Sequence, residues 1–112
     1  MKIIIESDGM ELSESVRAYA DKKFRVLEKF VTRFEKGGEI ELHVEILKTT
    51  EHHRKGDIYQ ANANIRLPGK MLNVEEKGDN VHTAIDLAKD VLKMEIEKYK
   101  DKVVGPKRGK GN

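Results

Sequence analysis

The fold is decided by a stretch of alternating polar and apolar residues, DIYQANANIRLPGKMLNVEEK, at positions 57–77. Side chains at every second position of a strand share one face of the sheet. The alternation therefore predicts one strand over Asp57–Leu67 and another over Lys70–Lys77. Pro68 and Gly69 lie between the two strands and form a typical turn dipeptide. The stretch is thus predicted to be an antiparallel hairpin.

Two further strands are predicted upstream of the hairpin. Residues Glu39–Lys48 alternate in the same way, which predicts a half-buried strand with an acidic outer face, and residues 49–56 read as a polar loop. Lys2–Ser7 contains three consecutive isoleucines, a pattern expected where both faces are covered, so we expect this strand inside the sheet. The side chains predicted to face the core from the three alternating strands are Ile40, Leu42, Val44, Ile46, Tyr59, Ala61, Ala63, Ile65, Leu67, Leu72 and Val74.

Two helices are predicted from apolar residues at three- and four-residue spacing. The first is expected to begin at the N-cap Ser13 and to end at Gly37-Gly38, and the second to begin at the N-cap Asp79 and to end near Pro106. Their core stripes are Val16, Ala20, Phe24, Leu27, Val31 and Phe34, and Val81, Ile85, Ala88, Leu92, Ile96, Tyr99 and Val103. The order β-α-β-β-β-α predicts an α+β sandwich, with both helices on one face of a four-stranded sheet.

Length and composition narrow the class of protein. A chain of 112 residues suits one domain, and we expect it over residues 1–104, followed by a basic, glycine-rich flexible tail at 105–112. No stretch approaches the roughly 20 apolar residues of a membrane span, and the N-terminus lacks a signal-peptide pattern, so we expect a cytoplasmic location and no membrane partner. The chain has no cysteine, which excludes disulfides, thiolate nucleophiles and cysteine-ligated zinc.

The charge of the chain is unevenly distributed. The net charge is only +2, but from Lys98 onward six cationic residues face one anionic residue, a local balance of +5, which leaves residues 1–97 at −3. Such a basic end is either a solvated tail or an arm that binds RNA, and composition alone favours neither. The same alternatives apply to Lys22, Lys23 and Lys29, which on their own fit an ordinary exposed helix face.

The histidines do not predict an enzyme or a metal site. His52 and His53 lie near Glu51 and Asp57, but adjacent histidines in a loop match no zinc-binding pattern. His82, in the first turn of the second helix, has no evident nucleophile or orienting group beside it. We therefore expect no catalytic residues, no cofactor and no small-molecule substrate.

Three local stretches, taken in order, resemble the hibernation-promoting factor and ribosome-associated inhibitor family, also called sigma-54 modulation proteins. The first is MELSESVR at 10–17, followed by Lys23-Phe24 and by LEKF at 27–30. The second is the hairpin LPG at 67–69, which leads to Glu75-Glu76, and the third is GDNV at 78–81, followed by TAID at 83–86 and KYKDK at 98–102. The order and spacing of these pieces, over nearly the whole chain to about Lys102, carry the resemblance.

The resemblance implies a fold related to double-stranded-RNA-binding domains and a non-enzymatic role as a translation inhibitor. Members of this family bind ribosomal RNA in the cleft of the small ribosomal subunit where messenger and transfer RNA would lie. The basic positions that this chain shares with the family are Arg17, Lys23, Lys98, Lys100 and Lys102. We add the adjacent Lys22 and the loop residues Arg54 and Lys55 as candidate RNA-binding residues.

The chain departs from the family in the middle of its second helix. Val91 and Met94 stand where the family usually carries a lysine and an arginine, and with Leu87 they form an apolar ribbon roughly opposite the core stripe. Either this ribbon is buried against a neighbouring loop or the tail, or it contacts a partner or a second copy. The alternative function is accordingly a protein-interaction or dimerisation module with weak RNA affinity, and we expect a monomer or a weak homodimer.

The position of an RNA-binding surface follows from the predicted faces of the sheet. Single-stranded RNA bound on a sheet needs exposed aromatic side chains for base stacking. The predicted outer face offers none, and its glutamates would repel phosphate. We therefore expect an RNA-binding surface on the helices, the loop and the tail.

Overall fold

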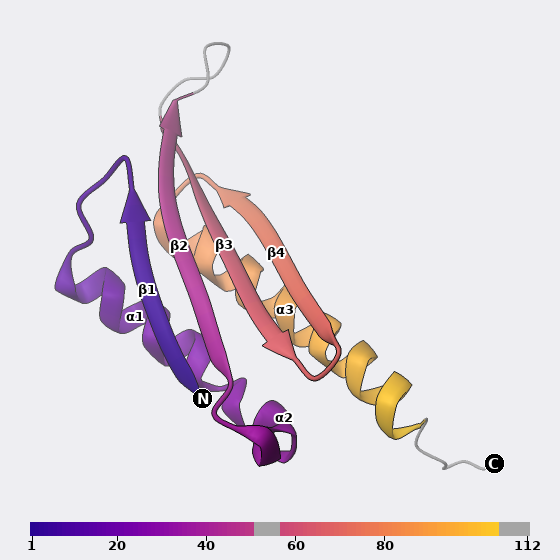
Figure 1. The fold of residues 1–112 in the computed structure, drawn as a ribbon. Helices are drawn as coiled ribbons and strands as arrows, with labels where there is room; N and C mark the ends of the chain where they lie inside the picture. Colours follow the sequence, from indigo (N-terminus) through magenta and orange to yellow (C-terminus); the bar gives the residue numbers. More distant parts are fainter. Residues whose placement is uncertain (51–56, 106–112) are drawn as a thin grey trace.

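The structure of this protein is a computed structural model that describes residues 1–50 and 57–105. Its elements are β1 (Lys2–Asp8), α1 (Glu14–Arg25), α2 (Glu28–Val31), the 3-10 helix η1 (Thr32–Gly37), β2 (Glu41–Thr50), β3 (Asp57–Leu67), β4 (Lys70–Gly78) and α3 (Val81–Val104). The predicted α+β class and the order β-α-β-β-β-α are confirmed. Figure 1 shows the four strands as one layer and α1 and α3 as a second layer on the same side of the sheet.

The sheet has the strand order β1-β2-β3-β4. β1 pairs with β2 in parallel, and the β2–β3 and β3–β4 pairs are antiparallel. The predicted hairpin is correct, and its turn places Gly69 at a φ of 76°, a conformation that glycine adopts without steric cost. The register aligns buried residues across the layer, since Val44 pairs with Ile5 on one side and with Ala63 on the other.

The prediction that the first strand lies inside the sheet is wrong, because β1 is an edge strand that pairs with β2 alone. Of its three isoleucines, Ile5 is buried and Ile3 and Ile4 are half-buried. A run of apolar residues reports how well the two faces of a strand are covered. It does not report how many neighbouring strands the edges have, and this is why the inference failed.

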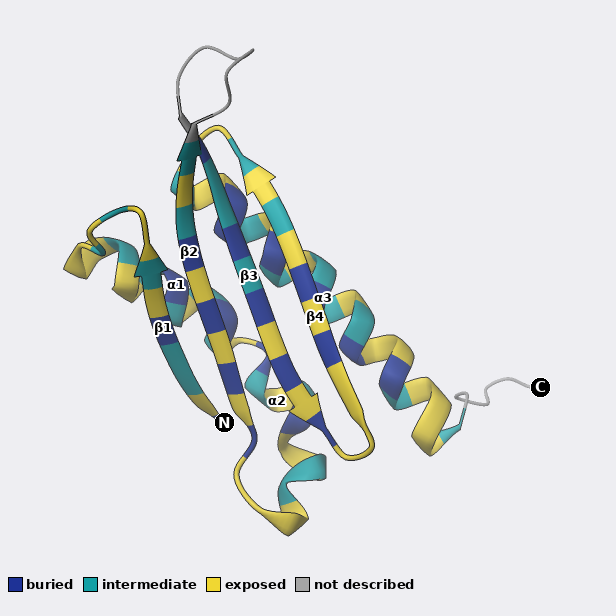
Figure 2. Ribbon diagram, turned by 45° about the horizontal axis from the view of Figure 1, so that its top comes forward, coloured by how far each residue is buried: buried dark blue, intermediate teal, exposed yellow. Residues whose placement is uncertain are grey.

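The core lies between the sheet and the helices, and Figure 2 shows the buried and exposed residues alternating along β2, β3 and β4. Every core residue predicted for β2, β3 and β4 is buried, apart from the half-buried Tyr59. In the two helical stripes, Val16, Phe34 and Val81 are half-buried, and Val103 alone is exposed, at 53%. It lies in the last turns of α3, which extend past the β3–β4 turn and so have no sheet to pack on (Figure 1).

The first helical region is not one continuous helix. α1 ends at Arg25, and α2 and η1 follow as separate short helices before Gly38. The β-branched residues Val26, Val31 and Thr32 lower the helix propensity here, and the Thr32 hydroxyl donates to the Glu28 carbonyl at 2.8 Å, a bond that bends helices. The Leu27 amide donates three residues back, to the Phe24 carbonyl, which tightens the chain at the junction of α1 and α2.

The N-cap of the first helix is Ser13, as predicted, but that of the last helix is Asn80. The Asn80 side-chain oxygen accepts from the Thr83 amide at 2.9 Å, while Asp79 lies one residue outside the helix. β4 continues through Gly78, so Asp79 serves as the connection and the helix starts one residue later than the sequence pattern indicates. Within the described ranges, no helix combines the length and the apolar character needed to cross a membrane.

Candidate nucleic-acid interface

The side chains of α1 and α3 meet through a polar cluster near the start of α3. The Tyr19 hydroxyl donates to the Asp86 carboxylate at 2.6 Å, and the Lys23 ammonium lies 3.5 Å from the same oxygen. The Tyr19 ring also packs edge-on against His82, with ring centroids 4.3 Å apart. The hydrogen bond to Asp86, with the partial burial of the phenol, raises the pKa of Tyr19 to about 12. Asp86 therefore fixes how the two helices lie and partly neutralises Lys23.

A second contact, between α2 and α3, involves two lysines and one aromatic ring. The ammonium groups of Lys29 and Lys93 lie 5.4 Å and 5.5 Å from the ring centroid of Phe30. Distances below about 6 Å allow a cation–π attraction. Neither lysine makes an ion pair with any residue that the structure describes. Two unneutralised positive charges thus converge on one ring between α2 and α3.

The three candidate RNA-binding residues of α1 differ in how much of their charge is free. Arg17 is exposed, but one guanidinium nitrogen donates to the Ile5 carbonyl at 3.1 Å and so ties α1 to β1. Lys23 shares Asp86 with Tyr19. Lys22 is exposed and has no ion pair within the described part of the chain. Of the three, only Lys22 has a charged group with no partner among the described residues.

The three candidates of α3 lie near its C-terminal end, away from α1. Lys98 pairs with Glu95 one turn earlier, at 3.5 Å, whereas Lys100 and Lys102 make no ion pair with described residues. These lysines therefore do not join Lys22 and Lys23 in one cluster. The loop candidates Arg54 and Lys55, and most of the expected basic tail, lie outside the described residues. The division into a domain at 1–104 and a tail at 105–112 stays a prediction.

The apolar ribbon predicted on the last helix is only partly present as a surface. Leu87 and Met94 are exposed, at 40% and 53%, but Val91 between them packs against the core. Burial of the whole ribbon against a neighbouring segment is not seen among residues 1–50 and 57–105. What remains is two exposed apolar side chains two helical turns apart, with half-buried Val91 between them.

The outer face of the sheet is polar and carries carboxylates. Glu6 and Glu45 are neighbours in the β1–β2 register, and Asn62 and Glu75 continue the row across β3 and β4. The Gln60 amide bridges Asn62 and Glu75 at 2.9 Å and 2.6 Å. All six Phe and Tyr residues of the chain lie on helices or face the core, so none of them is available for base stacking on this side.

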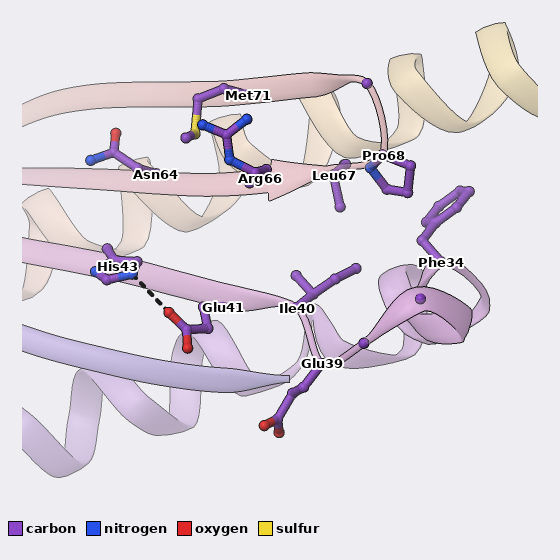
Figure 3. A pocket seen from close by; sticks show the side chains of 13 residues that line it. Phe34, Glu39, Ile40, Glu41, His43, Asn64, Arg66, Leu67, Pro68 and Met71 are labelled. Carbon is purple, nitrogen blue, oxygen red and sulfur yellow. Dashed lines mark hydrogen bonds and ion pairs between the residues drawn. The ribbon is translucent and has the colours of Figure 1, made fainter.

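A hollow of about 550 Å³ lies where the β3–β4 turn approaches η1. Figure 3 shows Phe34 and Pro68 at one end and His43, Asn64 and Arg66 on the outer sheet face at the other. His43 contacts Glu41 at 3.2 Å, and both side chains are exposed. Tyr99 supports this end of the molecule, because its hydroxyl donates to the Pro68 carbonyl at 2.6 Å and its ring packs against Phe34. The hollow offers a histidine and a carboxylate in solvent, with no nucleophile beside them.

No group of three or more histidines or carboxylates in the described ranges is placed to hold a metal ion. His52 and His53, which were considered as metal ligands in the sequence, lie outside those ranges. Sequence reasoning missed the contacts of Asp86 and Phe30 with the lysines. Their only signal was spacing, since Asp86, Lys93 and Lys100 recur every seven residues and thus share one side of α3.

Comparison with known proteins identifies the family. The family model described as "Sigma 54 modulation protein / S30EA ribosomal protein" matches residues 3–104. The chain therefore belongs to this family, as the sequence resemblance indicated.

Curated relatives carry the name ribosome hibernation promotion factor. The protein from Picosynechococcus sp. is 26% identical over 107 residues, which are 96% of this chain and 53% of that protein. The protein from Lactococcus lactis subsp. cremoris is 27% identical over 105 residues, or 92% of this chain and 51% of that protein. The chain spans about half the length of the curated relatives that it matches.

Two solved structures have a similar fold. One is a ribosomal subunit interface protein from Coxiella burnetii, with a TM-score of 0.67, 24% identity and coverage of 89% of this chain and 98% of that chain. The other is the N-terminal domain of Thermus thermophilus Protein Y, with a TM-score of 0.67, 24% identity and coverage of 88% and 99%. These likenesses show that the chain shares its α+β fold with both proteins.

Proposed function

We propose that this chain binds ribosomal RNA of the small ribosomal subunit and blocks translation by occupying the cleft for messenger and transfer RNA. Family membership and the name shared by its relatives support a role in ribosome hibernation. The structural observation that carries the proposal is a set of lysines on the helices that have no ion-pair partner among the described residues. Lys22, Lys29, Lys93, Lys100 and Lys102, on the helical side, make no ion pair with described residues, while carboxylates line the outer sheet face.

The mechanism proposed here is occupation of a site without chemistry. Ammonium groups neutralise RNA phosphates and release their counterions, and an RNA duplex is recognised mainly by its shape and its 2′-hydroxyls. The acidic outer face of the sheet repels phosphate, so the domain has one preferred orientation toward RNA. A well-packed domain held in the cleft then excludes other RNA by volume.

Competition for the small subunit tests this mechanism. Isolated small subunits carrying messenger RNA and a labelled transfer RNA are mixed with increasing amounts of the purified protein. The proposal predicts that transfer RNA is displaced as the protein binds, with one equivalent of protein per subunit. Stable complexes that hold the protein and the transfer RNA together would rule out occupation of the cleft.

A second candidate function, a dimerisation module, rests on the exposed side chains of Leu87 and Met94. Light scattering at high protein concentration, with Met94→Asp as the comparison, separates it from the first. A dimer that dissociates in the Met94→Asp variant would support the second candidate. A monomer that the substitution leaves unchanged would remove it.

A further inference from the structure

We propose that Lys29 and Lys93 form a phosphate-binding pair across the Phe30 ring, which joins the basic residues of α1 to those at the end of α3. This inference rests on the proposed binding to ribosomal RNA and adds to it a site for the RNA backbone. Lys29 was considered in the sequence only as one of several lysines on an exposed helix face, and Lys93 was not considered. The geometry around Phe30 is what singles them out.

The two ammonium groups approach the same ring, and neither makes an ion pair with a described residue. The Lys29 and Lys93 ammonium groups lie 5.4 Å and 5.5 Å from the same ring centroid, so both positive charges are near Phe30. The nearby carboxylates are engaged elsewhere or do not pair with them. Glu28 contacts the Met1 ammonium at 3.0 Å, Asp90 contacts Lys89 at 2.8 Å, and Glu97 makes no ion pair with Lys93. Each ammonium group is therefore available to a phosphate of an RNA strand.

The pair also lies between the basic residues of α1 and those at the end of α3. Along α3, Asp86, Lys93 and Lys100 are spaced by seven residues, which is close to two turns and about 10 Å per step. Lys23 of α1 contacts Asp86, Lys29 and Lys93 both approach the Phe30 ring, and Lys100 follows without an ion pair to described residues. Without Lys29 and Lys93, the cations of α1 and those of the α3 end are two separate groups. With them, positive charge runs along the junction of the helices.

Lys93 also supplies a positive charge in the part of α3 where the family usually carries a lysine and an arginine and this chain has Val91 and Met94. Val91 and Met94 are apolar, and the side chain of Val91 packs against the core, so neither can contact phosphate. Lys93 lies between them in sequence, and its half-buried side chain reaches the Phe30 ring. The positive charge of the middle of α3 is thereby directed toward α2.

The expected ligand is a phosphodiester of the RNA backbone. A nucleic-acid strand presents its charges every few ångströms, so adjacent ammonium groups suit a strand better than an isolated anion. Lysine contacts phosphate as a point charge with no base preference. The pair should therefore add affinity and salt dependence, but no sequence specificity.

The test measures binding to isolated small ribosomal subunits over a series of salt concentrations. The variant is Lys29→Gln/Lys93→Gln, and the matched control is Lys2→Gln/Lys70→Gln, which removes the same two charges from exposed positions on the edge strands β1 and β4. The double variant should bind about 10-fold more weakly at low salt, and the slope of log affinity against log salt should fall by roughly 1.5, while the control keeps both values. Lys93→Arg retains the charge and should bind like the unmodified protein. Thermal unfolding of each variant checks that the fold is kept.

The outcomes separate this inference from the function on which it rests. A double variant as tight as the control, while the unmodified protein binds, would overturn the phosphate-binding pair and leave ribosome binding intact. Equal weakening by the variant and the control would also overturn it, because net charge alone would then explain the loss. A protein that does not bind small subunits at low salt would overturn the proposed function itself.

Discussion

Each lysine on the helical side contributes according to what surrounds it. Lys23 and the Tyr19 hydroxyl both contact Asp86, so the charge of Lys23 is partly neutralised within the protein. Lys22 and Lys100 have no such partner among the described residues. The sequence could predict that these residues lie on helices. It could not predict that Tyr19 and Asp86, 67 positions apart, would meet, since that contact depends on how the two helices pack.

The bond between Tyr19 and Asp86 should be visible in a titration. In the folded protein the pKa of Tyr19 is raised from 10.0 to about 12. Because a raised pKa means that the fold favours the protonated phenol, the bond stabilises the protein below pH 10, and this contribution is lost as the pH rises toward 12. Asp86→Asn removes the carboxylate and should return the pKa of Tyr19 toward 10.

The measurement is ultraviolet titration of tyrosinate, with Tyr19→Phe to assign the signal and Asp90→Asn as a control on the same helix. Asp90 contacts Lys89 and has no bond to a tyrosine among the described residues. Superimposable curves for the unmodified protein and Asp86→Asn would show that the carboxylate does not hold the phenol.

At the scale of the elements, periodicity predicted most helices and strands, and the exceptions have local causes. The first helical region breaks after Arg25, where the Leu27 amide donates three residues back, and again at Thr32, whose hydroxyl bonds the Glu28 carbonyl. The last helix begins after Asn80 because β4 extends to Gly78. β1 lies at an edge because apolar content does not specify strand neighbours. The spacing of apolar residues therefore does not predict where neighbouring elements end or which strands pair.

The N-cap correction can be tested by paired substitutions. Asn80→Ala removes the acceptor of the Thr83 amide and should lower the free energy of unfolding by about 1 kcal/mol. Asp79→Ala, one residue earlier, should change it by less than about 0.5 kcal/mol. Urea denaturation of both variants makes the comparison. A larger loss for Asp79→Ala than for Asn80→Ala would restore the capping role predicted for Asp79.

The connection between β4 and α3 has no room for a side chain at Gly78. A Cβ there would lie 2.9 Å from the Ala84 nitrogen and 3.0 Å from the Thr83 Cβ. Gly78→Ala should therefore lower the free energy of unfolding by about 1–3 kcal/mol, because the start of α3 must shift.

Gly37 provides the matched control, since a Cβ at that position meets nothing within 4 Å. Gly37→Ala should leave the free energy of unfolding unchanged or raise it by about 0.4–1 kcal/mol, because alanine lowers the conformational entropy of the unfolded chain. Thermal and urea unfolding measure both variants. Equal stability of the two would contradict the tight packing described for Gly78.

For the whole molecule, the sequence predicted the class of fold, the faces of three strands and the family. It predicted less of the candidate interface. The net charge of +2 gives no hint of two unlike sides, and the lysines chosen by resemblance fall into separate groups on α1 and at the end of α3. Lys29 was one of several helix lysines noted in the sequence, but its contact with the same ring as Lys93 became apparent only in the structure.

The central claim is that cations on the helices of a nearly neutral domain bind ribosomal RNA. Cosedimentation of the purified protein with isolated small subunits, over a series of salt concentrations, tests it most directly. The account predicts tight binding at low salt, a steep loss of affinity as salt rises, and weaker binding by Lys98→Glu/Lys100→Glu/Lys102→Glu without unfolding. Absence of binding at low salt, or binding that salt leaves unchanged, would contradict it.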